Sequence, residues 1–336
     1  MLRRFLLAAG IGLAALAGAG GCSATRRGVV ASPPFDRSVV CAEQNLHRIV
    51  IFRADCDWSD PANILWSWEP ENDPGVVPDH RDWFRHPTEC KVVDGGEAIL
   101  MTSASEGAVA LLDVARCRVR FYAWVEGNPH SAEVLPDGNI VVVSSIGDTL
   151  SLFAVPNNPT VPYFAGEPAA QYPFRSAHGC VWDKEQRLLW VLGGNELAAF
   201  EYNDSKAAPA LVKRESYPLE NRRFLSAAAW EKVPERRRSR FDGHDLFPVP
   251  GSRELLLTGV FTVLKFDTVS RRFSGAWETR NLKSVSVNPA DGRLLFMRPT
   301  RRWWSESLII RDGGAFTLPG AKFYKGRWFS LNCFSY

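Results

Sequence analysis

Three short apolar segments separated by turn residues make up residues 130–155, which read HSAEVLPDGNIVVVSSIGDTLSLFAV. Each segment has the length of a β-strand and is rich in Val, Leu or Ile, while PDG and GD interrupt the pattern as tight turns do. A fourth apolar segment, VPYFAGE, follows at residues 161–167. Residues 130–167 therefore predict one unit of four short strands.

The same unit recurs along the chain. Its copies begin near residues 88, 130, 178, 244 and 283, and an incomplete copy occupies residues 38–70. Four-stranded units at intervals of about 40–50 residues are the sequence sign of a β-propeller. We therefore predict an all-β protein with a single six-bladed β-propeller, preferred to a seven-bladed one, over residues 38–336. The C-terminal segment 322–334 could supply the missing strand of the first blade and close the ring.

The N-terminus has the features of an export signal. Arg3 and Arg4 precede an apolar segment at residues 5–19, which is shorter than the ~20 residues of a bilayer span. The small residues before Cys22 resemble the lipobox of bacterial lipoproteins, which implies cleavage before Cys22 and acylation of its thiol. We predict a signal peptide at 1–21, a tether at 22–37 and a membrane anchor at Cys22. An ordinary secreted signal is the alternative.

Composition places the chain among globular proteins. Hydrophobic residues make up 46% and charged residues 23%, which excludes disorder and collagen-like repeats. The net charge is only +3, which argues against a general nucleic-acid binder because such proteins need a strong positive field. We expect a monomer held at the bacterial cell envelope by its lipid anchor. In an oxidising compartment Cys41 and Cys333 could form a disulfide that fastens the closed ring.

The histidines coincide at one position of the repeat. When the units are aligned on their first strands, His130, His178 and His244 occupy the same place, which Lys283 holds in the last unit. In the unit that begins near residue 88, the place is held by Thr88. The first strand of a propeller blade is the innermost one, so equivalent positions point toward one axis. These side chains are therefore expected to meet at one end of the axis.

Two chemical interpretations follow for this cluster. Three imidazoles around an open position could hold one divalent metal, Zn or Mn, that polarises a substrate. Without a metal, one histidine could act as general base while Lys283 holds an anionic group of the substrate. The alternative is structural, because a repeated histidine can fasten a blade or persist through duplication. The predicted catalytic residues are His130, His178, His244 and Lys283, and the predicted metal ligands are the three histidines.

A second group of side chains suits carbohydrate binding. Trp303 and Trp304 adjoin two arginines in the turn RPTRRWWSE at 298–306, and such aromatics can stack on a sugar face or contact an anionic polymer. The alternative is that they fill a hydrophobic gap beneath a sheet. The predicted substrate-binding residues are Glu89, His86, Arg175, Trp303 and Trp304.

Four segments resemble a known family. HPTECKVV (86–93), PHSAEVLPDGNIVVVSS (129–145), AHGCVWD (177–183) and GHDLFPVP (243–250) are similar to uncharacterised bacterial propeller lipoproteins, a domain of unknown function often found in polysaccharide-degrading bacteria. The resemblance runs from about Val39 to Ser286 and implies the propeller fold, but it brings no established activity. A weaker similarity is to propeller lyases of uronic-acid oligosaccharides, in which histidines bind a metal beside the scissile sugar.

Three classes of function therefore stay open. The first is a metal-assisted lyase that acts on acidic carbohydrate. The second is a non-catalytic propeller that binds a glycan or another ligand at the same place. The third is an envelope scaffold whose faces bind proteins.

Overall fold

The computed structural model of the chain describes residue 35 and residues 37–335, except 105, 158–161 and 332. These residues belong to one compact unit, Pro33–Tyr336. The predicted signal peptide, the predicted lipidation site Cys22 and most of the predicted tether lie outside the described residues. Among the helices of the described part, none is long and apolar enough to cross a membrane.

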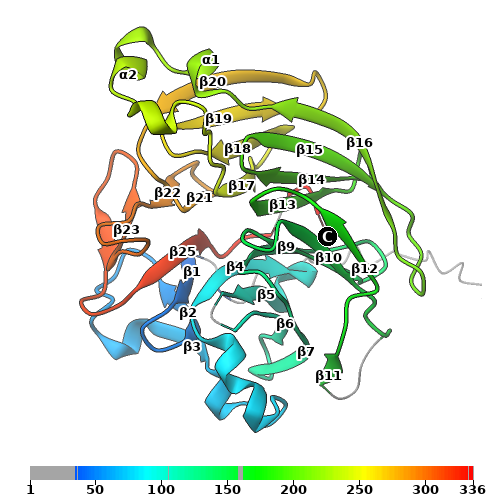
Figure 1. Cartoon of the computed structure of the whole chain (residues 1–336). Coiled ribbons are helices and arrows are strands. Elements are labelled where there is room, and N and C mark those ends of the chain that lie inside the picture. Colours follow the sequence, from blue (N-terminus) through cyan, green and yellow to red (C-terminus); the bar gives the residue numbers. More distant parts are fainter. Residues whose placement is uncertain (1–34, 36, 105, 158–161, 332, 336) are drawn as a thin grey trace, which may run out of the picture. The chain divides into compact units, whose positions relative to one another are not determined.

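Six small sheets, here called blades A to F, surround a central axis (Figure 1). From the axis outward, blade A contains β25 (Phe323–Trp328), β1 (Ser38–Glu43), β2 (Arg48–Arg53) and β3 (Ile64–Trp68). Blade B contains β4 (Pro87–Val93), β5 (Ala98–Ser103), β6 (Ala108–Asp113), β7 (Arg118–Trp124) and β11 (Tyr163–Ala165). Blade C contains β8 (Pro129–Val134), β9 (Ile140–Ser144), β10 (Thr149–Phe153) and β12 (Ala170–Pro173).

The other three blades have four strands each. Blade D contains β13 (Ala177–Asp183), β14 (Leu188–Gly193), β15 (Glu196–Tyr202) and β16 (Leu211–Pro218). Blade E contains β17 (Asp245–Pro248), β18 (Glu254–Thr258), β19 (Thr262–Asp267) and β20 (Arg272–Glu278). Blade F contains β21 (Ser284–Val287), β22 (Leu294–Met297), β23 (Ser307–Ile310) and β24 (Ala315–Thr317). The predicted six-bladed β-propeller is confirmed.

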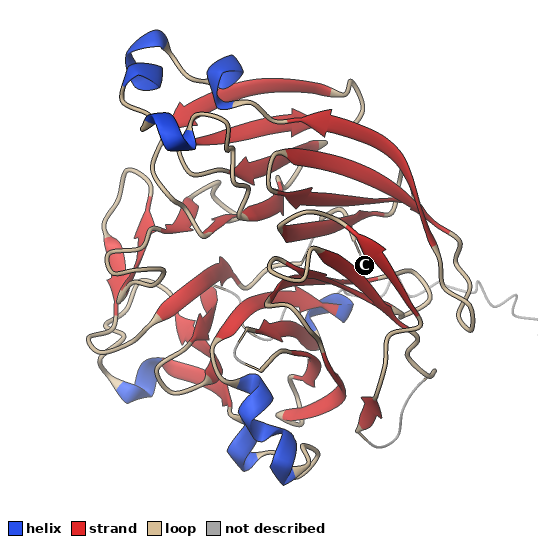
Figure 2. Cartoon of the chain, in the orientation of Figure 1, coloured by secondary structure: helices blue, strands red, loops and turns tan. Residues whose placement is uncertain are grey.

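Helices are short and lie in the connections between strands (Figure 2). The α-helices are α1 (Asn221–Phe224) and α2 (Ala227–Glu231). The 3-10 helices are η1 (Pro61–Asn63), η2 (Pro70–Asn72), η3 (Pro78–Phe84), η4 (Asp94–Gly96) and η5 (Glu235–Arg237). The long connection from β16 to β17 carries α1, α2 and η5, and it contains the arginine-rich segment PERRRSR at 234–240.

The core lies between the blades. Each pair of neighbouring blades shares one buried hydrophobic cluster, so six clusters follow one another around the axis. Because neighbouring blades cover both faces of a sheet, the middle strands are apolar throughout rather than alternating. The segment IVVVS of β9, for example, is buried at all of its positions. The run of valines that marks the repeat in the sequence is therefore the mark of a doubly covered strand.

The C-terminal strand closes the propeller. β25 pairs antiparallel with β1, with Val39 opposite Trp328 and Ala42 opposite Lys325. It contacts the inner strands β4 and β21 of the two neighbouring blades, so it is the innermost strand of blade A. The prediction that residues 322–334 complete the first blade is confirmed. The described cysteines are all free, so the structure does not contain the disulfide that Cys41 and Cys333 could have formed.

One strand assignment was wrong. The segment 161–167 was expected to be the fourth strand of the unit that begins at His130, but its strand β11 pairs in parallel with β7 at the outer edge of blade B. The fourth strand of blade C is β12, which pairs with β10. Both segments are short, contain aromatic residues and neighbour prolines, so their pattern does not show on which sheet edge each one pairs.

Candidate functional site

Residues at the starts of the inner strands occupy a common place in the backbone. In blades B, C and D this place is a β-bulge, at which Thr88, His130 and His178 are extra residues in the pairing with the second strand. In blade A the extra residue is Tyr324, between Phe323 and Lys325. A bulge changes the direction of a side chain relative to a regular strand. The shared bulge explains why these side chains do not point in the direction that regular alternation along their strands would give them.

Blades E and F show the same arrangement at the first residue before the strand. The backbone N–H of His244 donates to the carbonyl oxygen of Thr258 (2.8 Å), and Thr258 also pairs with the following residue, Asp245. In the same way, the N–H of Lys283 donates to the carbonyl oxygen of Met297 (3.0 Å), which also pairs with Ser284. Six equivalent side chains thus lie at one end of the axis, and we call them the axial ring. The axial ring consists of Tyr324, Thr88, His130, His178, His244 and Lys283.

The axial ring brings the predicted catalytic residues into contact. The imidazoles of His130 and His178 stack with centroids 4.6 Å apart, and those of His178 and His244 meet edge to face at 4.9 Å. Tyr324 also stacks on His130, with ring centroids 5.3 Å apart. Lys283 Nζ lies 2.8 Å from His244 Nε2. The expectation that these side chains meet at one end of the axis agrees with this geometry.

Hydrogen bonds define the protonated nitrogen in two of the histidines. The side-chain amide of Asn128 donates to Nε2 of His130 (3.0 Å), so the proton of a neutral His130 resides on Nδ1. The carbonyl oxygen of Ser176 lies 2.8 Å from Nδ1 of His178 and can only accept. His178 therefore carries its proton on Nδ1 and leaves Nε2 as an acceptor.

The hydrogen bond with Lys283 decides which nitrogen of His244 carries the proton. A protonated Lys283 donates to Nε2 of His244, which places the imidazole proton on Nδ1. Nδ1 of His244 and Nδ1 of His130 are both buried without a hydrogen-bond partner among the described residues. A buried donor without a partner costs about 1–3 kcal/mol, and a bound ligand is one way to satisfy it.

Burial sets the protonation of the axial ring. It lowers the pKa of His178 to about 4, with smaller contributions from Lys283 and Lys325. The pKa values of His130 and His244 also lie well below the ordinary value, first because of burial and then because of neighbouring basic groups. Near pH 7 the three imidazoles are therefore neutral.

Lys283 is the titratable cation of the ring. Burial is the main cause that brings its pKa down to about 8, Asp242 opposes this shift, and Lys325 and Arg237 add to it. Lys283 is thus mostly charged at pH 7, about half charged at pH 8 and mostly neutral at pH 9. The geometry provides one ammonium, two imidazole N–H donors and one imidazole acceptor at the same end of the axis.

An ion-pair network fills the axis below the ring. Lys325 Nζ bonds to Glu89 (3.1 Å), Asp245 (3.0 Å) and the carbonyl of His130 (3.1 Å). Arg327 bonds to both oxygens of Glu89 (2.8 and 3.0 Å) and to Asp245 (2.7 Å). Burial alone would raise the pKa of Glu89, but Arg327 and Lys325 hold it well below its ordinary value.

A further buried pair belongs to the same network. Lys91 Nζ lies 3.1 Å from Glu133 and 2.6 Å from the carbonyl oxygen of Cys180 in blade D. With Glu89, Glu133 and Asp245 opposite Lys91, Lys325 and Arg327, the network is balanced in charge. Glu89, predicted to bind substrate, is fully buried here with both oxygens bonded, so its placement gives no support to that role.

The metal prediction gains no support from the geometry. Lone pairs of an imidazole lie in the ring plane, and the planes of His130 and His178 are stacked at only 15°. One ion bound to both would lie well out of the plane of at least one of them. Among the described residues, no group of three or more His, Cys, Asp or Glu side chains is arranged to hold a metal ion. The Zn or Mn site remains a prediction.

The predicted binding aromatics line a separate pocket at the same end of the propeller. The pocket has a volume of about 360 Å³. It is lined by Gln44, His86, Arg301, Arg302, Trp303, Trp304 and Lys322. Three of the five predicted substrate-binding residues, His86, Trp303 and Trp304, thus come together. Arg175 is exposed in the connection from β12 to β13 and does not line this pocket.

Sequence reasoning missed the residues of blade A. Tyr324, Lys325 and Arg327 belong to β25, which lies far from the other units in the chain and was not aligned with their first strands. Regular alternation along the inner strands would direct Asp245 and Glu133 away from the axis, yet both carboxylates belong to the axial network. Asp245 of blade E contacts Lys325 of blade A, although blade F separates the two. The sequence did contain a signal for these residues, because YKGR at 324–327 places a basic residue at two alternate positions, as an inner strand facing buried carboxylates would.

The comparisons with known proteins identify the family. The model of the family of unknown function DUF6528 matches residues 2–336. The chain belongs to this family. The suspected membership in a propeller family without an established activity is thus confirmed. No curated protein matches the chain.

Solved structures agree with the fold of this DUF6528 member. A candidate 6-phosphogluconolactonase from Bacteroides uniformis is 11% identical, with a TM-score of 0.53, over 86% of this chain and 83% of that one. A candidate 6-phosphogluconolactonase from Bacteroides fragilis is also 11% identical, with a TM-score of 0.50, over 83% of this chain and 79% of that one. At such identity the likeness concerns the fold alone.

Proposed function

We propose that the axial ring binds the carboxylate of an acidic carbohydrate. The observation that carries the proposal is the contact of Lys283 with His244 beside two neutral histidines. The ammonium of Lys283 and the imidazole N–H groups can donate to a carboxylate, and charge-assisted hydrogen bonds are stronger than neutral ones. Nε2 of His178 can accept from a neighbouring hydroxyl. A carboxylate next to a hydroxyl is the pattern of a uronic acid.

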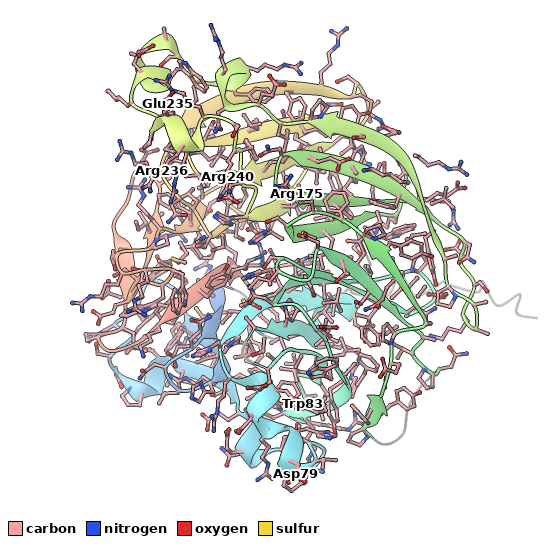
Figure 3. The ribbon with its side chains drawn as sticks, viewed as in Figure 1. Asp79, Trp83, Arg175, Glu235, Arg236 and Arg240 are labelled. Carbon is pink, nitrogen blue, oxygen red and sulfur yellow. The ribbon has the colours of Figure 1, made fainter. Side chains whose placement is uncertain are left out.

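The charge distribution supports an anionic ligand. The network below the ring is balanced, so Lys283 adds a positive charge that the network does not neutralise. Asp242 and Arg237 of the long connection both lie close enough to influence its pKa. In Figure 3, Arg236, Arg240 and Arg175 follow one another across the region of blades D and E. Cations near the ring, such as Lys283 and Arg237, raise the local concentration of an anionic ligand.

A calorimetric titration with galacturonate and its neutral counterpart galactose tests the proposal. The unaltered chain is expected to bind galacturonate at least ~10-fold more tightly, and Lys283→Gln is expected to remove that preference. Lys265→Gln is the matched control, because Lys265 is paired with Glu254 on blade E away from the ring. Equal affinity for the two sugars, or an unchanged preference in Lys283→Gln, would refute the proposal.

A second candidate function is elimination on the same carbohydrate. It is favoured by one observation, which is the lowered pKa of Lys283 at about 8 beside a neutral imidazole. A neutral Lys283 could remove the proton next to the uronate carboxylate. The electrons of that C–H bond would form a C=C bond while the glycosidic C–O bond breaks, and the leaving oxygen would take up a proton. Ultraviolet absorbance of the unsaturated product, absent in Lys283→Gln, distinguishes this lyase from a simple binder.

We also keep the expectation that the chain acts at the cell envelope, anchored through Cys22. Export and lipidation concern residues outside the described part of the chain. No step of the proposed binding or elimination passes through a metal.

A further inference from the structure

The pocket lined by Trp303 and Trp304 is a built site. The indole N–H of Trp303 donates to the side-chain oxygen of Gln44 (3.1 Å), which fixes the orientation of the ring. The turn that carries it is held by backbone hydrogen bonds between Arg301 and Trp304 and between Ser305 and Phe323 of β25. Trp303 is nevertheless 42% exposed. A fixed and partly exposed indole offers an apolar face at little cost in conformational entropy.

Cations surround the two indoles. The guanidinium of Arg302 lies 5.8 Å from the centre of the Trp303 ring, and Nζ of Lys322 lies 5.7 Å from that of Trp304. Arg301 lines the same pocket. Burial lowers the pKa of His86, and His47, Lys322 and Arg85 add to this shift, so His86 contributes a neutral ring. An apolar face with several cations around it suits a sugar ring that carries a negative charge.

The pocket adjoins the axial ring through two inner strands. Lys322 precedes Tyr324 of the ring by two residues, a distance of about 6.6 Å along a strand. Gln44 connects the pocket to the next blade as well, because its amide group donates to the carbonyl of Pro87 (3.1 Å), which precedes Thr88 of the ring. The two sites therefore lie at the same end of the propeller, within reach of one short oligosaccharide.

We propose that this pocket is a second subsite for an acidic oligosaccharide. One sugar of the oligosaccharide occupies the axial ring, and a neighbouring acidic sugar binds in this pocket. The natural ligand is then an oligomer of acidic sugars rather than a single uronate. This inference rests on the proposed function of the axial ring. Trp303 stacks on the sugar, and Arg301, Arg302 and Lys322 contact its carboxylate.

The test compares galacturonate with its linear trimer by calorimetry. The unaltered chain is expected to bind the trimer at least ~10-fold more tightly than the monomer, which corresponds to one added stacked and charged contact. Trp303→Ala is expected to remove this gain, so that the trimer binds no more tightly than the monomer. The matched control is Trp124→Ala, because Trp124 is 37% exposed and donates one hydrogen bond from its indole, but lies on the outer part of blade B.

The outcomes separate this inference from the function on which it rests. If Trp303→Ala keeps the gain, or if the trimer binds no better than the monomer, the subsite is refuted. If instead the trimer depends on Trp303 but neither ligand responds to Lys283→Gln, the role of the axial ring is refuted and the pocket stands. Should Trp303→Ala fail to fold, Arg302→Gln and Lys322→Gln keep both indoles and are expected to lose the preference for the acidic over a neutral trimer.

Discussion

Replacing Arg327 with methionine tests how the propeller is held closed. Arg327 lies in the last strand and donates hydrogen bonds to Glu89, Asp245 and the carbonyl of Val285. Methionine has a similar length but no charge, so Glu89 and Asp245 keep only Lys325 as a common cation. Removal of one partner from a buried ion pair costs about 3–5 kcal/mol, because a desolvated charge is left without compensation.

The loss is measurable as a thermal shift. At about 2–4 °C per kcal/mol for a large domain, Arg327→Met is expected to lower the melting temperature by roughly 6–20 °C. Differential scanning calorimetry provides the measurement. The control is Arg214→Met, which breaks the exposed pair of Arg214 and Glu201 on blade D, with side chains 55% and 51% exposed. Exposed pairs contribute about 0–1 kcal/mol, so the control should melt close to the unaltered chain.

A second substitution shows whether the unpaired charge is the cause. Adding Glu89→Gln to Arg327→Met removes the carboxylate that lost its partner, so it should recover part of the stability. The reasoning is refuted if Arg327→Met and Arg214→Met have the same melting temperature. It is also refuted if adding Glu89→Gln to Arg327→Met lowers the melting temperature further instead of raising it.

Two further predictions concern the closed ring and its histidines. A chain that ends at Gly320 lacks β25, so blade A loses its inner strand, and Glu89 and Asp245 lose Lys325 and Arg327. Circular dichroism and gel filtration should then show no native propeller. A folded monomer would contradict this prediction. Lowering the pH from 7 to 5 should reduce the free energy of unfolding, because the unfolded chain binds a proton that folded His178, with its pKa of about 4, does not. For this residue the loss is about 2 kcal/mol. Urea titrations measure it, and a stability that is flat over this range, or an equal slope in His178→Phe, would contradict it.

Much of the architecture could be predicted from the sequence because the blades repeat. A strand covered on both faces must be apolar at every position, so segments such as IVVVS identify themselves, and Gly, Asp and Pro mark the turns between them. The place of the histidines at the starts of the first strands follows from the same repetition. Contact among the imidazoles is then a consequence of the fold.

What could not be predicted depends on pairing between distant parts of the chain. β25 completes the first blade from the other end of the sequence, so Tyr324, Lys325 and Arg327 had no neighbouring unit to reveal their place. The bulges that redirect His130 and His178 are departures from regular alternation, so alternation alone does not show that Asp245 and Glu133 face the axis. The edge on which β11 pairs is likewise decided by packing at the rim rather than by its own residues.

The central claim is that the charge of Lys283 holds the anionic ligand at the axial ring. Its most direct test is the affinity for galacturonate as a function of pH. Lys283 has a pKa of about 8 and faces His244, Asp242, Lys325 and Arg237. The histidines stay neutral above pH 6, so the affinity should be constant from pH 6 to 7 and about 10-fold lower at pH 9, where about one lysine in ten remains charged. Lys283→Gln should show weak binding without this slope. An affinity that stays constant up to pH 9, or the same slope in Lys283→Gln, would contradict the account.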